Sequence, residues 1–172
     1  TGDLSFDFRS PNNLFALIDM FVGVGDVAME QIEAKSVNLE EIKKIMPVTK
    51  LRTDIGTGNP VTKILALNGM SFDVVKADLR TSPENGLTGW AHVFGFKTDS
   101  IRIDTLYCNL VQDSTLFNYK AGIRCDDQKL CPGFSAVLDG YIAAQDADAH
   151  LTYVSKKGKQ GMDLGVKAFF TD

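Results

Sequence analysis

Apolar and polar residues alternate with a period close to two from Gly69 almost to the end of the chain. This alternation is typical of half-buried β-strands, and turn residues interrupt it at intervals. It predicts six or seven strands, over residues 70–80, 86–96, 100–112, 115–125, 133–144, 149–155 and 161–171. Because the breaks are short, consecutive strands are expected to run antiparallel as a meander.

One face of the predicted sheet is apolar and the other is polar, as in a sheet with one face in water. The residues expected to line the apolar face, as a core or as a lipid groove, are Phe117, Tyr119, Ala121, Ile123, Phe134, Ala136, Leu138, Ile142, Met162, Leu164, Val166, Ala168 and Phe170. Between Ile103 and Leu106 the alternation changes parity. One extra residue would restore a common apolar face, so we predict a β-bulge near Asp104 and Thr105.

A first helix is predicted over residues 14–22, with Ser10 as N-cap and Pro11 at the first helical position. Its apolar residues recur at helical spacing and are expected to cover the apolar face of the sheet. They are Leu14, Leu17, Ile18, Phe21 and Val22. Gly23 and Gly25 are expected to end this helix, and residues 27–37 fit either a helix or a strand.

Three shorter elements precede the strands. Asn38 followed by Glu41 resembles a capping arrangement, and it predicts a helix over residues 39–45 that Pro47 stops. A strand is possible over residues 51–55. Asn59 before Pro60 repeats the cap signal, so residues 61–67 form one or two helical turns, with a strand as the alternative. Further along the chain, residues 146–148 are expected to form a hairpin turn.

Charge and composition exclude few functions. The net charge of -4 argues against nucleic acid as a partner, since nucleic acid binding requires a basic face. No apolar run reaches the roughly 20 residues that a membrane helix needs. The sequence has no signal peptide and begins with Thr1, so we expect it to be a fragment of a longer chain.

Candidate chemistry is sparse. Cys125 and Cys131 flank a polar turn, so a disulfide is geometrically possible, although half-buried thiols, including Cys108, are the favoured interpretation. His92 and His150 lack a nucleophile in a recognisable context, and we interpret both as structural or surface residues. The sequence contains no catalytic constellation and no metal motif, so we expect a non-enzymatic protein without a cofactor.

Five segments along the chain form a further pattern: residues 36–42, SVNLEEI, 53–60, TDIGTGNP, 79–89, LRTSPENGLTG, 111–115, VQDST, and 158–166, GKQGMDLGV. Together these segments resemble the AsmA-like/TamB family (translocation and assembly module B) of envelope proteins, in its Bacteroidetes-type Gram-negative form. The similarity covers most of residues 27–172. It rests on a repetitive β pattern and not on one motif.

The resemblance implies a long parent protein that is anchored in the inner membrane and spans the periplasm. It also implies a taco-like β-sheet whose hydrophobic face carries phospholipid towards the outer membrane or helps outer-membrane proteins to assemble. Phospholipid and outer-membrane assembly proteins would then be the partners. The family has no catalytic residues, so the resemblance assigns none to this chain.

We therefore expect a mainly β module, a curved antiparallel meander that is taco-like or a partly open barrel, with short helices near the N-terminus. Residues 1–172 are expected to form one module, with a helix-containing region over 1–68 and the meander over 69–172. Open strand edges are expected to let molecules self-associate. The alternatives are a closed lipid-binding barrel, in which the strand near Met70 pairs with the strand near Phe170, and a purely structural repeat module.

Overall fold

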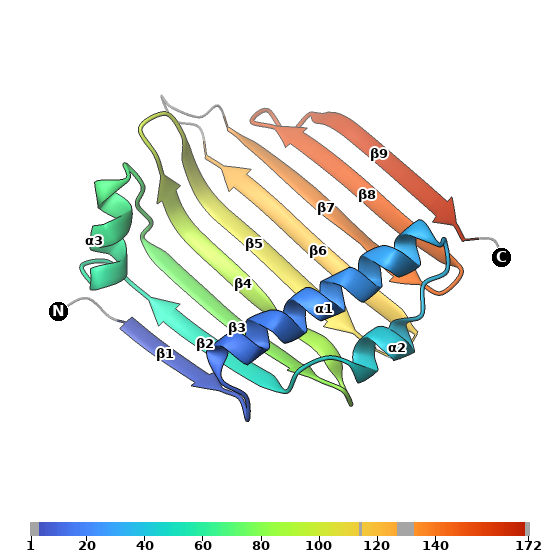
Figure 1. The fold of residues 1–172 in the computed structure, drawn as a ribbon. Coiled ribbons are helices and arrows are strands. Elements are labelled where there is room, and N and C mark those ends of the chain that lie inside the picture. Colours follow the sequence, from blue (N-terminus) through green and yellow to red (C-terminus); the bar gives the residue numbers. More distant parts are fainter. Residues whose placement is uncertain (1–3, 114, 127–132, 171–172) are drawn as a thin grey trace.

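Nine strands form a single antiparallel sheet in which the strand order follows the sequence (Figure 1). The computed structural model describes residues 4–113, 115–126 and 133–170. The strands are β1 (Leu4–Arg9), β2 (Thr49–Ile55), β3 (Val74–Ser82), β4 (Gly86–Lys97), β5 (Arg102–Gln112), β6 (Leu116–Cys125), β7 (Phe134–Ala143), β8 (Asp146–Ser155) and β9 (Gln160–Phe169). The mainly β, antiparallel meander is therefore confirmed, with seven strands after Gly69 where six or seven were expected. The possible strand at residues 51–55 is β2, and β1 was not predicted.

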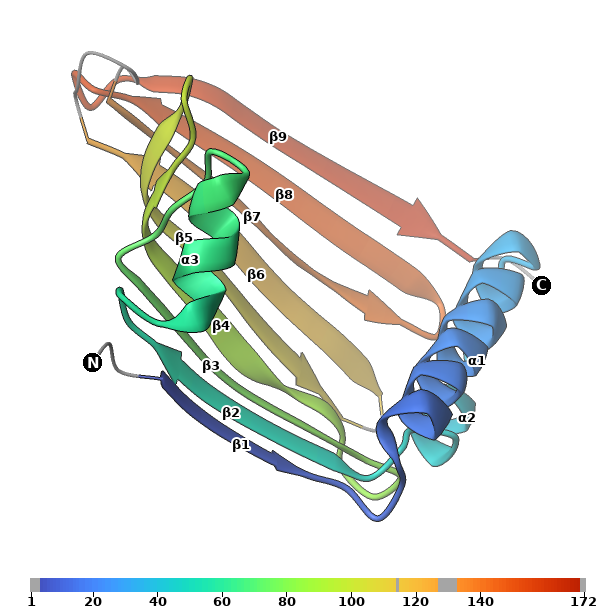
Figure 2. The ribbon, with the colours of Figure 1, turned by 60° about the vertical axis from the view of Figure 1, so that its left-hand side comes forward.

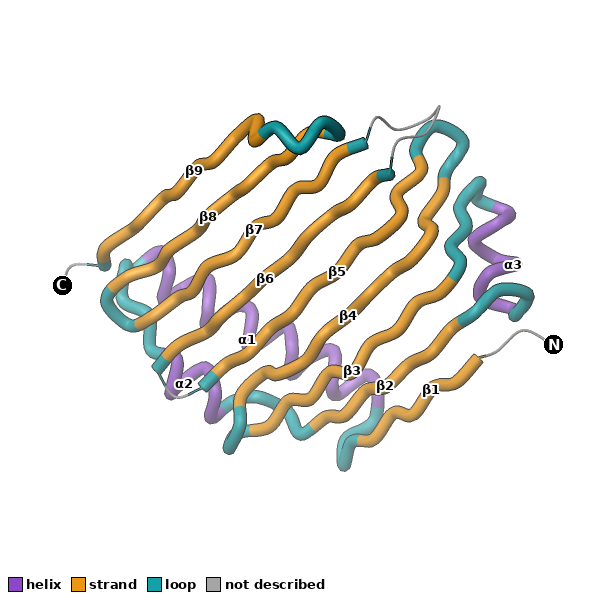
Figure 3. The backbone as a smooth tube through the Cα atoms, turned by 180° about the vertical axis from the view of Figure 1, so that it is seen from behind, coloured by secondary structure: helices purple, strands orange, loops and turns teal. Residues whose placement is uncertain are grey.

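The sheet is curved and open (Figures 2 and 3). Within the described residues, β1 pairs only with β2 and β9 pairs only with β8. The strand that follows Met70 is β3, and its neighbours are β2 and β4. The closed-barrel alternative is therefore wrong. Self-association through the two open edges stays a prediction.

The first helix, α1 (Leu14–Glu33), is much longer than predicted. Its N-cap is Asn13, whose side-chain oxygen accepts a hydrogen bond from the Ala16 N–H at 2.9 Å. Ser10 was the predicted cap, but its hydroxyl donates to the Val48 carbonyl at 2.9 Å. The helix continues through Gly23 and Gly25, and neither glycine has the positive φ that is common for a glycine at the end of a helix.

The left-handed residue that ends α1 is Lys35, with φ of 54°. The N–H groups of Lys35 and Ser36 donate to the carbonyls of Ile32 and Gln31, both at 3.0 Å. This pair of bonds is a Schellman motif, which satisfies carbonyls that a helix end leaves open. Residues 27–33 are therefore helical, which settles the open choice between helix and strand there.

The two asparagine caps are where the sequence predicts them. The Asn38 side chain accepts from the Glu41 N–H at 3.1 Å and begins α2 (Leu39–Lys44). Asn59 begins α3 (Pro60–Leu67), where its side chain accepts from the Thr62 N–H and the Thr62 hydroxyl accepts from the Asn59 N–H, both at 3.1 Å. This reciprocal pair is a capping box. It selects the helix over the strand for this segment.

The predicted bulge near Asp104 and Thr105 is wrong, because β5 keeps a constant register with β4 and with β6. The pairing omits Gly95 of β4, which has φ of 63°, together with Asp104 opposite it, and Phe96 still pairs with Ile103 beyond them in the same register. Ile103 therefore lies on the opposite face from Leu106. The change of parity therefore arises because Ile103 is an apolar residue on the opposite face of the sheet, and not because the strand contains an extra residue.

One other local prediction is corrected, and one irregularity was not predicted. The irregularity is a register shift between β8 and β9 at Tyr153 and Val154. The predicted hairpin turn at residues 146–148 is the start of β8, and the chain turns just before it, at Ala144 and Gln145. Asp146 and Asp148 then pair with Phe169 and Lys167 of β9, so strand pairing overrides the turn preference of aspartate.

Helices α1 and α2 lie across one face of the sheet at one end of the strands (Figures 1 and 2). The core there consists of Val24, Val37, Leu39, Ile42 and Met46, packed against Leu87, Phe117, Ile142 and Phe170 from the sheet side. Helix α3 links β2 to β3 at the opposite end. The rest of the helix-bearing face has no helix over it in the described structure.

Candidate hydrophobic groove

All of the predicted apolar-face residues lie on the helix-bearing face. Directly paired residues of antiparallel strands point to the same side of a sheet. Phe117 pairs with Ile142, Ala121 with Leu138, and Leu138 with Leu151 of β8, which pairs in turn with Leu164 of β9. Phe170 follows β9 and packs against the helix core. We call this surface the apolar face.

The apolar face also extends across strands that precede residue 117. Its additional members include Leu4, Phe6, Phe8, Leu51, Leu79, Ala91, Val93, Leu106 and Cys108. The β1 residues were missed although the signal is present, since Leu4, Phe6 and Phe8 alternate with Ser5, Asp7 and Arg9. A six-residue run before a helix signal gives too few alternations to stand out.

Much of the apolar face is exposed. Phe6 of β1 is 64% exposed and Leu138 of β7 is 41% exposed, and Met162, Leu164 and Val166 of β9 are also exposed. Soluble proteins rarely leave large contiguous apolar surfaces in water, and such a surface marks an interaction site or a ligand groove. The uncovered part of the apolar face is therefore the candidate site.

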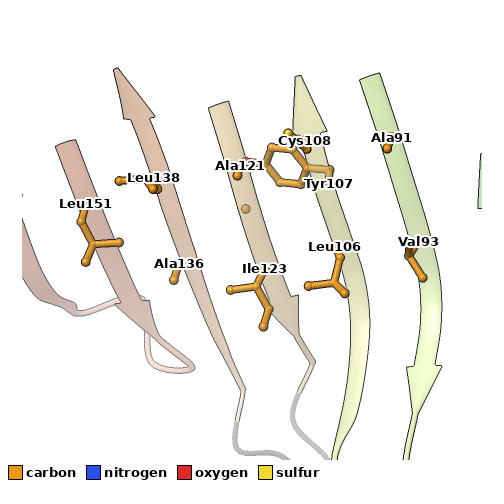
Figure 4. A pocket seen from close by; sticks show the side chains of 11 residues that line it. Ala91, Val93, Leu106, Tyr107, Cys108, Ala121, Ile123, Ala136, Leu138 and Leu151 are labelled. Carbon is orange, nitrogen blue, oxygen red and sulfur yellow. The ribbon is translucent and has the colours of Figure 1, made fainter. Parts of the chain in front are cut away.

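The middle of the uncovered surface forms an open hollow of about 380 Å³, the central hollow (Figure 4). Its lining comes from β4 to β8 and consists of Ala91, Val93, Leu106, Tyr107, Cys108, Ala121, Gly122, Ile123, Ala136, Leu138 and Leu151. Four of these residues are alanine or glycine, and their small side chains leave the space between the larger lining residues unfilled. The volume falls within the range of about 300–1,000 Å³ that is usual for ligand sites.

A second space of about 200 Å³, the helix cavity, lies between α1, α2 and the sheet. It is lined by Val24, Gly25, Ala28, Ile32, Val37, Leu39, Ile42, Met46, Leu87, Gln112, Phe117 and Ile142. Gln112 is the one polar side chain in this lining. Its amide nitrogen donates to the Leu39 carbonyl at 3.3 Å and its amide oxygen accepts from the Leu87 N–H at 3.1 Å. The cavity wall is otherwise apolar.

Tyr119 stands between the two spaces on β6. Phe117, on the helix-cavity side of Tyr119, lies 6.4 Å from it between ring centroids, and Ala121 of the central hollow is on the other side. The Tyr119 hydroxyl donates to the Asp148 carbonyl at 3.0 Å. Burial, followed by the charge of Asp148, raises the pKa of Tyr119, so its hydroxyl stays neutral and the surface uncharged.

The predicted covering residues of α1 are only partly correct. Leu17 is 2% exposed, whereas Ile18 is 52% and Phe21 is 40% exposed. The contact with the core is made further along, by Val24 with Val27 and Ala28. The Leu14 side chain lies outside the described residues. Because α1 is twice as long as predicted, its contact moves to a second stretch of the helix.

The opposite face of the sheet carries most of the charge. Lys76 pairs with Asp54 at 3.0 Å, Arg80 with Asp78 at 2.9 Å, and Lys167 with Asp146 at 2.9 Å. His92 lies among aromatic rings on this face, 5.1 Å from Trp90 and 6.1 Å from Tyr107 between centroids. The sheet as a whole is therefore amphipathic.

His150 of β8 pairs with Asp163 of the edge strand β9 on this charged face. The hydrogen bond that the His150 ring donates to the Asp163 carboxylate raises the pKa of His150, and the same bond lowers the pKa of Asp163. The histidine contribution to stability is thus present below its ordinary pKa of about 6.5 and is lost as pH rises through the raised value. The aspartate contribution is lost only as pH falls through its lowered pKa.

The melting temperature of a His150→Gln variant should therefore be lower than that of the wild type, and the difference should be largest between about pH 4 and 6.5. The difference should shrink as pH increases further. Thermal melts of both proteins across this range measure it, with His92→Gln as the control for loss of a histidine elsewhere. A difference that does not change with pH would show that the pair is not an ion pair.

The remaining candidate chemistry gives no second site. Cys125 is buried, Cys131 of the possible disulfide lies outside the described residues, and Cys108 is a free, half-buried thiol in the central hollow. Across residues 4–113, 115–126 and 133–170, no three His, Cys, Asp or Glu side chains group as a metal site. None of the described helices is long and apolar enough to span a membrane.

Comparison with protein-family models, with curated proteins and with solved structures finds no match for this chain.

Proposed function

We propose that this chain is a non-enzymatic segment of an envelope protein that spans the periplasm from an inner-membrane anchor, and that its apolar face carries phospholipid. The observation that supports the proposal is an apolar face that crosses all nine strands and has helices over one end only. The resemblance to the AsmA-like/TamB family supplies the envelope setting.

The chemistry of the face matches acyl chains. Burying apolar surface contributes about 25 cal/mol per Å², or about 0.8 kcal/mol for each methylene, so a lipid tail is bound by area without a specific polar contact. The charged opposite face keeps the sheet in water while the tail is carried. A lipid headgroup could stay in solvent, because the central hollow is open on one side.

The test is native mass spectrometry of the chain expressed in a Gram-negative host, followed by lipid extraction. Phospholipid should co-purify with the wild type. The amount of co-purified phospholipid should be at least about tenfold lower for a Leu138→Asp variant. A charge at the apolar contact costs more than the 1.4 kcal/mol of binding free energy that a tenfold change requires.

Val111→Asp is the matched control. Val111 is 49% exposed, close to the 41% of Leu138, but it pairs with Thr88 and Asn118 on the charged face. This variant should keep its lipid. Lipid-free wild-type protein that is fully folded would contradict the proposal and favour a purely structural module, as would equal loss of lipid from both variants.

A further inference from the structure

Helix α1 carries two interior glycines that nothing in the described chain requires. Glycine in a helix interior costs about 0.8–1 kcal/mol relative to alanine. Neither Gly23 nor Gly25 has a positive φ, and a Cβ built on either would have no atom within 4 Å. Backbone strain and close packing are the usual reasons for glycine, and neither applies here. The missing side chains leave open space beside the helix.

The two glycines differ in what lies next to them. Gly25 lines the helix cavity together with Val24, Ala28 and Ile32, whereas Gly23 does not line it. Val24 and Met46 are buried in this cavity, while Gly25 and Ile32 are exposed. The cavity therefore opens towards solvent at Gly25 and Ile32, and a Cβ at position 25 would stand in open space at this opening.

The lining selects an apolar occupant. Both polar ends of Gln112 already have partners, so a polar ligand group would lose its hydration without gaining a hydrogen bond from that side chain. A dry cavity of about 150 Å³ lined by Leu, Ile and Phe accommodates benzene. The helix cavity, at about 200 Å³, is thus large enough for the last several carbons of a hydrocarbon chain.

The position of the cavity suggests how the rest of such a chain would lie. Along β6, Phe117 lines the helix cavity and Ala121 and Ile123 line the central hollow, with the neutral Tyr119 ring between them. The two spaces thus follow one another along a single strand of the apolar face.

We propose that the helix cavity binds the methyl end of one acyl chain, with the remainder of the chain in the central hollow, and that the absent side chain at Gly25 keeps the cavity open. The proposal rests on the proposed function, since it specifies how a carried lipid is seated. In this arrangement α1 holds the tail at a fixed depth, and the headgroup end projects towards the uncovered part of the face.

The experiment uses stearate spin-labelled either near its methyl end or near its carboxylate, with methyl NMR of the whole chain. The Met46 methyl reports on the helix cavity and the Ile123 methyl reports on the central hollow. The label near the methyl end should broaden the Met46 signal strongly, and the label near the carboxylate should leave it sharp. Gly25→Leu should abolish the Met46 broadening, while Gly23→Leu should retain it.

Both leucine variants gain helix propensity, so both should melt no lower than the wild type. Broadening of Ile123 without broadening of Met46 in the wild type would overturn the seating in the helix cavity and leave lipid binding to the face intact. Loss of the Met46 effect in both glycine variants would overturn the role of Gly25. If neither label broadens any methyl on the apolar face, the proposed function fails as well.

Discussion

Leu17→Ala is expected to reduce the free energy of unfolding by about 2–5 kcal/mol, the range for removing a buried leucine side chain. Leu17 is 2% exposed and is the most buried of the described side chains of α1. Leu17 and Val24 are the two buried residues among the described side chains of α1, whereas Phe15, Ile18 and Phe21 are exposed. Loss of this side chain should therefore weaken the attachment of α1 to the sheet.

Urea unfolding measures the change in stability, and hydrogen exchange of the α1 amides shows whether the helix detaches first. Phe15→Ala is the matched control in the same helix, because Phe15 is 80% exposed. It should change the stability by less than about 0.5 kcal/mol. Equal effects of the two substitutions would contradict the packing of α1 on the apolar face.

Gly140→Ala is expected to cost about 3 kcal/mol, at the upper end of what overpacking usually costs. A Cβ at this position would collide with the backbone carbonyl of Asp148 on the neighbouring strand and lie 2.7 Å from the Tyr119 hydroxyl. A backbone oxygen in a paired strand cannot move aside without disturbing the β7–β8 pairing. The hydrogen bond from Tyr119 to Asp148 should be lost at the same time.

The free energy of unfolding of this variant is compared with that of Gly165→Ala in β9. A Cβ at Gly165 would meet only the His150 Cδ2 atom, at 3.9 Å, which is an ordinary contact. The control should therefore stay within about 0.5 kcal/mol of the wild type. A Gly140→Ala protein of wild-type stability would show that neither the Asp148 carbonyl nor the Tyr119 hydroxyl lies against Gly140.

These two substitutions act on the parts of the molecule that hold the apolar face in shape. Leu17 is the most buried of the described α1 side chains, and Gly140 leaves room for the Tyr119 hydroxyl to reach the Asp148 carbonyl. An apolar surface this extensive is unfavourable in water unless something covers it. The phospholipid proposed here would supply that cover, and its removal should make the protein prone to association.

The elements that the sequence predicts well are those encoded by local chemistry. The asparagine caps at Asn38 and Asn59 form because a side-chain oxygen reaches an N–H three residues ahead, a contact that needs no other part of the chain. The strands after Gly69 follow from long alternation, and their register keeps the predicted apolar residues together.

The predictions that were wrong depend on distant partners. Ser10 has the chemistry of an N-cap, but its hydroxyl bonds to the Val48 carbonyl, 38 residues away. Gly23 and Gly25 have low helix propensity, yet they remain helical because Val24 between them and Val27 and Ala28 after them pack in the core with α2 and the sheet. Asp146 and Asp148 favour a turn, but both belong to β8 because they pair with residues of β9.

The sequence by itself determined that this protein is an amphipathic antiparallel meander, because the period of two assigns each residue to a face regardless of where the strands meet. Only the tertiary structure decided that the sheet stays open, that α1 and α2 cover one end of its apolar face, and that a cavity remains beneath Gly25. Those features depend on which surfaces of distant segments fit together, and hydrophobic burial is non-directional, so the pattern of apolar residues alone does not specify them.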